Sequence, residues 1–131
     1  MSKSNPLLSA SLILFGVLFC LLYPILLLWP SGWAWHHGSP AANDYFMMIC
    51  FIYFTLGVFM IRAAKEPAAN ASLIWFVIWS SLAHAAIMTW EAFRTPMMMG
   101  HLVGDIPALL VAAGVLAFLM KRERPRVSAA V

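Results

Sequence analysis

The stretch LLSASLILFGVLFCLLYPILLLW, residues 7–29, decides the class of fold because it contains no charged side chain. A helix crosses the hydrocarbon core of a bilayer with about 20 consecutive apolar residues. A secretory signal peptide has a shorter apolar core, of about 7–15 residues. We therefore expect residues 7–29 to stay in the protein as a transmembrane helix that bends at Pro24, because proline cannot donate a helical hydrogen bond.

The composition of the whole chain agrees with a membrane protein. Of its 131 residues, 63% are apolar and 10% are charged, and the mean hydropathy is +0.87. These values exclude a soluble globular domain. The basic tail KRERPR, residues 121–126, is short and lacks interleaved aromatic residues. We expect this tail to meet the membrane surface, and we expect no nucleic-acid partner.

Three further apolar runs follow, each bounded by helix start and stop signals. We expect an all-α fold, a four-transmembrane-helix bundle in one integral membrane domain. Its spans are predicted at about residues 7–29, 44–62, 71–91 and 105–120. The first span carries Gly16 and Cys20 four residues apart. Small residues at this spacing let helices approach closely, so we expect tight packing there.

The basic residues predict the orientation because loops rich in Lys and Arg stay in the cytoplasm. With four spans, the N-terminus, the loop at residues 62–70 and the C-terminus share one side. That side holds seven of the eight basic residues: Lys3, Arg62, Lys65, Lys121, Arg122, Arg124 and Arg126. We therefore expect a multi-pass protein of a bacterial inner membrane, with both termini in the cytoplasm.

The third span carries polar side chains that an apolar helix must accommodate. In SSLAHAAIMTWEAF, residues 80–93, His84 and Glu91 are seven residues apart, which is close to two helical turns. Ser80 and Ser81 lie one turn before His84 on the same side, whereas we expect Ile74 and its neighbours to face lipid. Exposing an ionisable side chain to hydrocarbon is costly. We therefore expect the polar face to meet protein or water.

The other titratable groups gather at the predicted outer end. His36 and His37 belong to the first outer loop, Asp44 begins the second span, and His101 and Asp105 precede the fourth. Because hairpin loops in small bundles are short, we expect these groups to lie close together above His84.

Two interpretations of the third span are open. Its His84, Ser80 and Ser81 form a ligand pocket, a proton relay or a haem or metal site, or His84 is a neutral side chain that hydrogen-bonds across helices. Asp105 has an alternative role as a helix N-cap. Glu91 has one as the ion-pair partner of Arg94, three residues further on.

The signals for a metal are weak. The sequence contains no His-x3-His or HExxH spacing, and His36 and His37 are adjacent. Met97 and Met99 beside His101 suit Cu(I), but methionine is also a flexible apolar filler. We predict no metal and no cofactor, and these five residues are weak metal candidates only.

Three blocks of sequence resemble those of a known protein family. They are SGWAWHHGSP (31–40), YFTLGVFMIRAAKEPAANASLIWFVIWSSLAHAAIM (53–88) and GHLVGDIPALL (100–110). The blocks are similar to an uncharacterised bacterial family of small four-helix integral membrane proteins, over most of the chain. The resemblance implies the four-span fold and no established activity, so no catalytic residue is carried over.

Three functions are open at this point. The leading hypothesis is a non-enzymatic protein that binds a lipid-soluble ligand or a partner membrane protein through the polar face of the third span. Its candidate contacts are Ser80, Ser81, His84, Glu91, Asp44, His101 and Asp105. The second hypothesis is a transport or proton-conducting oligomer lined by His84 and Glu91, and the third is a metal- or haem-dependent membrane redox protein. The expected partners are the lipid bilayer and a homo-oligomer or larger membrane complex.

Overall fold

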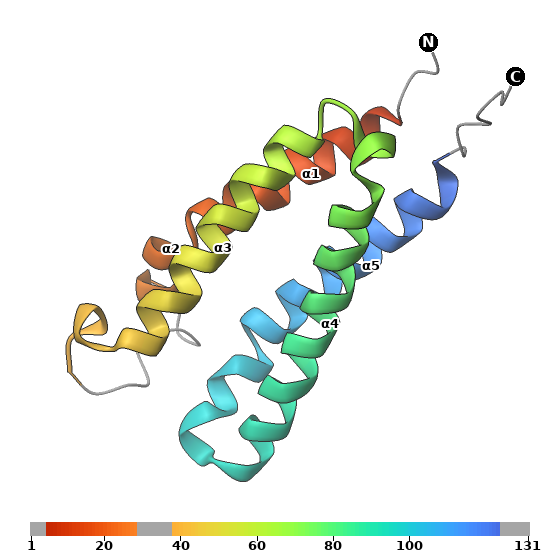
Figure 1. The fold of residues 1–131 in the computed structure, drawn as a ribbon. Helices are drawn as coiled ribbons and strands as arrows, with labels where there is room; N and C mark the ends of the chain where they lie inside the picture. The colour runs from red at the N-terminus through yellow and green to blue at the C-terminus, as the bar shows by residue number, and fades with distance from the viewer. Residues whose placement is uncertain (1–4, 29–37, 124–131) are drawn as a thin grey trace, which may run out of the picture.

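The fold is all-α over the residues that the computed structural model describes, 5–28 and 38–123. Figure 1 shows the helices in chain order. The five α-helices are α1 (Pro6–Cys20), α2 (Leu22–Leu28), α3 (Asp44–Ala63), α4 (Ala71–Arg94) and α5 (Asp105–Arg122). Three short 3₁₀ helices precede the last three of them: η2 (Pro40–Ala42), η3 (Pro67–Asn70) and η4 (Pro96–Leu102). Trp29, Trp33, Trp35, His36 and His37 lie outside the described residues.

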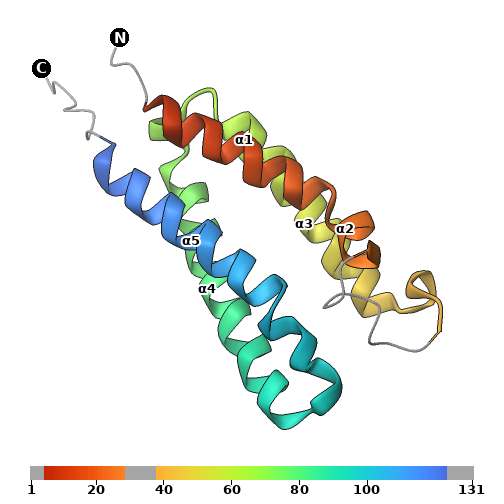
Figure 2. The same ribbon diagram turned by 180° about the vertical axis from the view of Figure 1, so that it is seen from behind.

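The helices form two pairs that meet at one end and diverge toward the other. α1 packs along α3 and α4 packs along α5, whereas α3 and α4 touch far less. Both views show the pairs as two arms (Figures 1 and 2). At the end where they meet, the backbone N–H of Asn5 donates to Oε2 of Glu123 at 3.1 Å. The start of α1 and the end of α5 are therefore neighbours, together with the α3–α4 connection.

The first apolar run is not one straight helix. α1 and α2 are separated at Leu21 and bent by 66°. Pro24 explains the position of the break, because its ring clashes with the carbonyl of the residue four before it, Cys20, and it has no N–H to donate. The predicted bend at Pro24 is confirmed, and its size divides the predicted helix into two.

The α1–α3 pair is held by a close approach of two backbones at Gly16 and Gly57. A Cβ atom placed on Gly16 would lie 2.8 Å from the carbonyl oxygen of Gly57 and 2.8 Å from Cγ1 of Ile61. A Cβ atom on Gly57 would collide with the carbonyl oxygen of Gly16. The Cys20 thiol donates to the carbonyl of Phe54 at 3.6 Å in the same region. The tight packing predicted at Gly16 and Cys20 is confirmed.

The main core lies toward the end where the pairs meet. Its fully buried side chains come from four α-helices and include Leu8, Leu12, Met60, Ile74, Val77 and Leu116. The prediction that Ile74 faces lipid is wrong: its side chain is 0% exposed, whereas its neighbour Phe76 is 60% exposed. The prediction therefore assigned the wrong side of α4 to lipid at this position. The first turns of α4 are almost uniformly apolar, so the sequence has no alternation of polar and apolar residues that would distinguish the buried side from the exposed side.

Length and composition make three helical segments able to cross a membrane. They are Asp44–Ala63, Pro67–Arg94 and Pro96–Arg122. The number of candidate membrane spans rises to four if the bent pair Pro6–Cys20 and Leu22–Leu28 forms one span. Many large apolar side chains on these helices are exposed, among them Phe51, Ile52, Trp79 and Phe118. This exposure is compatible with a multi-pass membrane protein, in which lipid covers such side chains.

Candidate functional site

A hydrogen bond in the middle of the molecule joins the two helix pairs. The hydroxyl of Tyr53, on α3, lies 2.8 Å from Nδ1 of His84, on α4. The rings meet edge to face, with centroids 5.7 Å apart and an interplanar angle of 69°. If the Tyr53 hydroxyl donates, Nδ1 accepts and Nε2 carries the ring proton; in the other tautomer the roles reverse. Among the described residues, no hydrogen bond uses Nε2.

Tyr53 is placed by contacts with both parts of the apolar interior. Its ring meets that of Phe19 on α1 edge to face, with centroids 4.9 Å apart. It also packs against the main core and against a smaller cluster formed by Ala85, Ile106 and Leu109. Contacts with α1, α4 and α5 therefore fix the Tyr53 ring in the position from which its hydroxyl reaches His84. Sequence reasoning missed Tyr53, although a phenol hydroxyl inside an apolar run signals that a partner is needed.

A second polar pair lies on η4 and α5. Nδ1 of His101 is 2.7 Å from Oδ2 of Asp105, and the two side chains are 13% and 18% exposed. Asp105 is the first residue of α5, but Gly104 is the N-cap residue and no side chain caps this helix. The prediction of Asp105 as a cap is therefore wrong. Its carboxylate instead orients His101, one turn earlier.

The two pairs form one electrostatic group. Both Asp105 and His101 are near enough to His84 for Coulombic interactions with its ring. We call Tyr53, His84, His101 and Asp105 the polar cluster. It combines two imidazoles, a phenol and a carboxylate, and it offers both donors and acceptors. The sequence predicted three of its four members.

Of the two serines on the predicted polar face, one hydrogen-bonds within α4 and the other is buried. The Ser80 hydroxyl donates to the carbonyl of Val77 at 3.2 Å, within α4 itself. Ser81 is 1% exposed and lies on the buried side of α4, with Ile78 and Ala85. Small hydroxyl-bearing residues of this kind allow close helix packing. Ser80 and Ser81 thus lie next to the polar cluster along α4 without a hydrogen bond to it.

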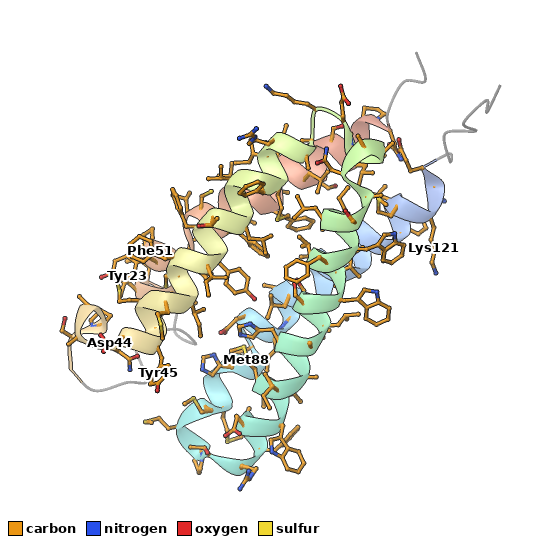
Figure 3. All side chains as sticks on the ribbon, in the orientation of Figure 1. Tyr23, Asp44, Tyr45, Phe51, Met88 and Lys121 are labelled. Carbon is orange, nitrogen blue, oxygen red and sulfur yellow. The ribbon has the colours of Figure 1, made fainter. Side chains whose placement is uncertain are left out.

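Glu91 and Asp44 lie apart from the polar cluster. Glu91 is exposed two turns beyond His84, about 10 Å along the helix axis. No ion pair joins it to Arg94 in the described part of the chain; the Arg94 guanidinium lies over the Trp90 ring, 5.7 Å from its centroid. Asp44 is exposed at the start of α3, on the other arm, and Figure 3 shows it well away from Met88 of α4. The predicted gathering of all outer groups is therefore only partial.

Asp44 belongs instead to a shallow hollow on α3. This hollow is lined by Asp44, Tyr45, Met47, Met48 and Phe51. The arms diverge toward this end of the molecule (Figure 3). The divergence is why short loops did not bring Asp44 to His101 and Asp105.

Three of the weak metal candidates, Met97, Met99 and His101, lie on η4. Met97 and Met99 are 43% and 54% exposed on η4, and His101 is occupied by Asp105. Over residues 5–28 and 38–123, no three His, Cys, Asp or Glu side chains gather as a metal ion needs. His36 and His37 fall outside these ranges.

The fold and the polar cluster define a class: an apolar, all-α chain compatible with a multi-pass membrane protein, with ionisable groups between its helices. A family model described as "Family of unknown function (DUF6632)" matches residues 3–128. The chain therefore belongs to this family. No curated protein and no solved structure matches it.

Proposed function

We propose that this chain is a four-span protein of a bacterial inner membrane, with both termini cytoplasmic, and that its polar cluster binds a lipid-soluble ligand. The ligand would carry a hydrogen-bonding group, such as a carbonyl or hydroxyl, on an apolar body. A partner membrane protein is the alternative occupant of the same face.

The observation that carries the ligand proposal is the hydrogen bond between Tyr53 and His84. It fixes the imidazole between two helix pairs and engages only Nδ1, so Nε2 can meet a ligand atom as donor or acceptor. Ionisable side chains at membrane depth are costly and generally functional. His101 and Asp105, within Coulombic range, add polarity beside the same ring.

The topology proposal is supported by the positions of the basic residues. Arg62 and Lys65 lie at the α3–α4 connection, and Lys121 and Arg122 lie at the end of α5. The hydrogen bond between Asn5 and Glu123 joins the start of α1 to the end of α5, and the α3–α4 connection lies at the same end of the molecule (Figure 1). A basic end of this kind stays in the cytoplasm.

Single cysteines test the topology. With Cys20 and Cys50 replaced by Ala, Val103→Cys introduces a thiol at a site 73% exposed near the opposite end, and Lys65→Cys introduces one at the basic end. In intact cells, a membrane-impermeant maleimide should label Cys at 103 and should label Cys at 65 only after lysis. The reverse pattern would overturn the orientation.

Extraction of native membranes tests the ligand. The full chain and its His84→Ala variant are taken into polymer-bounded lipid discs, and mass spectrometry compares the small molecules in their organic extracts. We expect a lipid-soluble compound that the His84→Ala extract lacks. Thr89→Ala is the matched control, because the Thr89 hydroxyl donates to its own helix, at Ala85, and should not affect the compound. Identical extracts from wild type and His84→Ala would remove His84 from ligand binding.

A further inference from the structure

A second surface, which is apolar, lies between α3 and the first turns of α4. None of the four residues of the polar cluster belongs to its lining. The surface is a groove of about 400 Å³, lined by α3 residues between Phe51 and Phe59 and by Leu73 and Phe76 of α4. Its lining runs about 12 Å along α3. The one hydroxyl in it, that of Thr55, donates to the carbonyl of Phe51 at 3.0 Å, so the groove presents a mostly apolar surface.

A cation stands at one end of this groove. The Arg62 guanidinium lies over the Phe59 ring, 5.9 Å from its centroid, and Phe59 is itself part of the lining. Thr55, Phe59 and Arg62 follow one another at helical spacing and so lie along one side of α3. No carboxylate among the described residues forms an ion pair with Arg62. The surface therefore joins a shallow apolar groove to a cation that forms no ion pair in the described part of the protein.

We propose that this groove binds an anionic phospholipid, with an acyl chain against Phe51, Phe59 and Phe76 and its phosphate at Arg62. The charge and the shape together select this occupant. An acyl chain can lie along a shallow apolar groove, whereas the arginine fork hydrogen-bonds phosphate oxygens. Lys65, exposed just beyond the end of α3, adds to the same positive end. The site is independent of any ligand at His84.

Arg122 offers a matched control for the charge. Its guanidinium also lies over an aromatic ring, that of Phe118, at 4.1 Å from the centroid, and it stands at the same end of the molecule. It is on α5 and does not belong to the α3–α4 groove. Arg62→Gln and Arg122→Gln therefore remove the same charge from the same end, but only the first removes it from the groove.

Native mass spectrometry of the purified full chain measures the bound lipid directly. The protein in detergent is mixed with phosphatidylglycerol or phosphatidylcholine of identical acyl chains, and the retained copies are counted. We expect phosphatidylglycerol to be preferred, and we expect Arg62→Gln to weaken its binding about five-fold, the effect of one basic residue near an anionic surface. Arg122→Gln should leave it within two-fold of wild type. Equal losses in both variants, or no preference between the lipids, would overturn the proposal.

The acyl-chain part has its own variant. Thr55→Trp fills the groove, whereas Val58→Trp adds the same bulk to an exposed position of α3 outside the lining. Thr55→Trp should reduce the retained phosphatidylglycerol several-fold, and Val58→Trp should not. Equal retention in the two Trp variants, with unchanged helical content by circular dichroism, would show that the groove is not the site.

Discussion

The two contacts that α3 makes with its neighbours are built in opposite ways. Against α1, its closest approach is between backbones, where Gly57 meets Gly16. Against α4, it presents the hydroxyl of Tyr53, which reaches His84 across a junction with few other contacts. The first contact depends mainly on shape and the second on a polar interaction, so the two should respond to different substitutions.

The largest effect is expected at the close approach of the α1 and α3 backbones. Gly57→Leu places a side chain where even a Cβ atom collides with the Gly16 carbonyl oxygen, so α1 must move away from α3. Overpacking of this kind costs about 1–3 kcal/mol or more. Thermal unfolding in detergent, followed by circular dichroism, should show a clear loss of stability.

Gly114 provides the matched control for this substitution. A Cβ atom there would meet nothing within 4 Å. Gly114→Ala should leave the protein as stable or raise its stability by about 0.5–1 kcal/mol, because alanine favours the helix more than glycine does. A Gly57→Leu protein as stable as the Gly114→Ala protein would contradict the backbone contact.

An intermediate effect is expected at the polar contact. Tyr53→Phe keeps the ring and removes the hydroxyl, so a double-mutant cycle with His84→Ala isolates the hydrogen bond. Interhelical hydrogen bonds in membrane proteins contribute about 0.6 kcal/mol on average and up to about 1.7 kcal/mol. We expect a coupling free energy within this range. The pair Tyr53→Phe and Thr89→Ala should show none, since the Thr89 hydroxyl bonds within α4.

The smallest effect is expected at the pair of His101 and Asp105. Asp105→Asn keeps the shape of the side chain and removes its charge. Because the contact is local (i,i+4) and asparagine keeps an oxygen that can accept a hydrogen bond from His101, the loss of stability should stay below about 1 kcal/mol. A loss larger than that of Gly57→Leu would mean that the polar cluster, and not the glycine contact, holds the fold.

Some of these features follow from the sequence and others do not, for physical reasons. Pro24 predicted the bend because proline acts locally on one turn. Gly16 and Cys20 predicted a close contact, but their partner Gly57 was not identified, since spacing within one helix says nothing about which helix faces it. The polar cluster was found in part because charged groups in apolar runs are conspicuous. Tyr53 was missed because the aromatic ring of tyrosine is common in apolar runs, and only its hydroxyl requires a hydrogen-bond partner.

The placement of the outer groups could not be predicted in the same way. Asp44 and His101 are each close to the end of a helix, and short loops alone predict that they lie together. Their separation depends on the divergence of the two helix pairs, which is set by packing at the other end of the molecule. No local pattern in the sequence contains that information.

Nitrogen-15 solid-state NMR of His84 in lipid bilayers tests the central contact most directly. If Tyr53 bonds Nδ1, the Tyr53→Phe variant should shift the His84 Nδ1 resonance strongly and leave the ring nitrogens of His101 nearly unchanged. His84 resonances that are identical in wild type and Tyr53→Phe would contradict the bond, and with it the account of how the two helix pairs are joined.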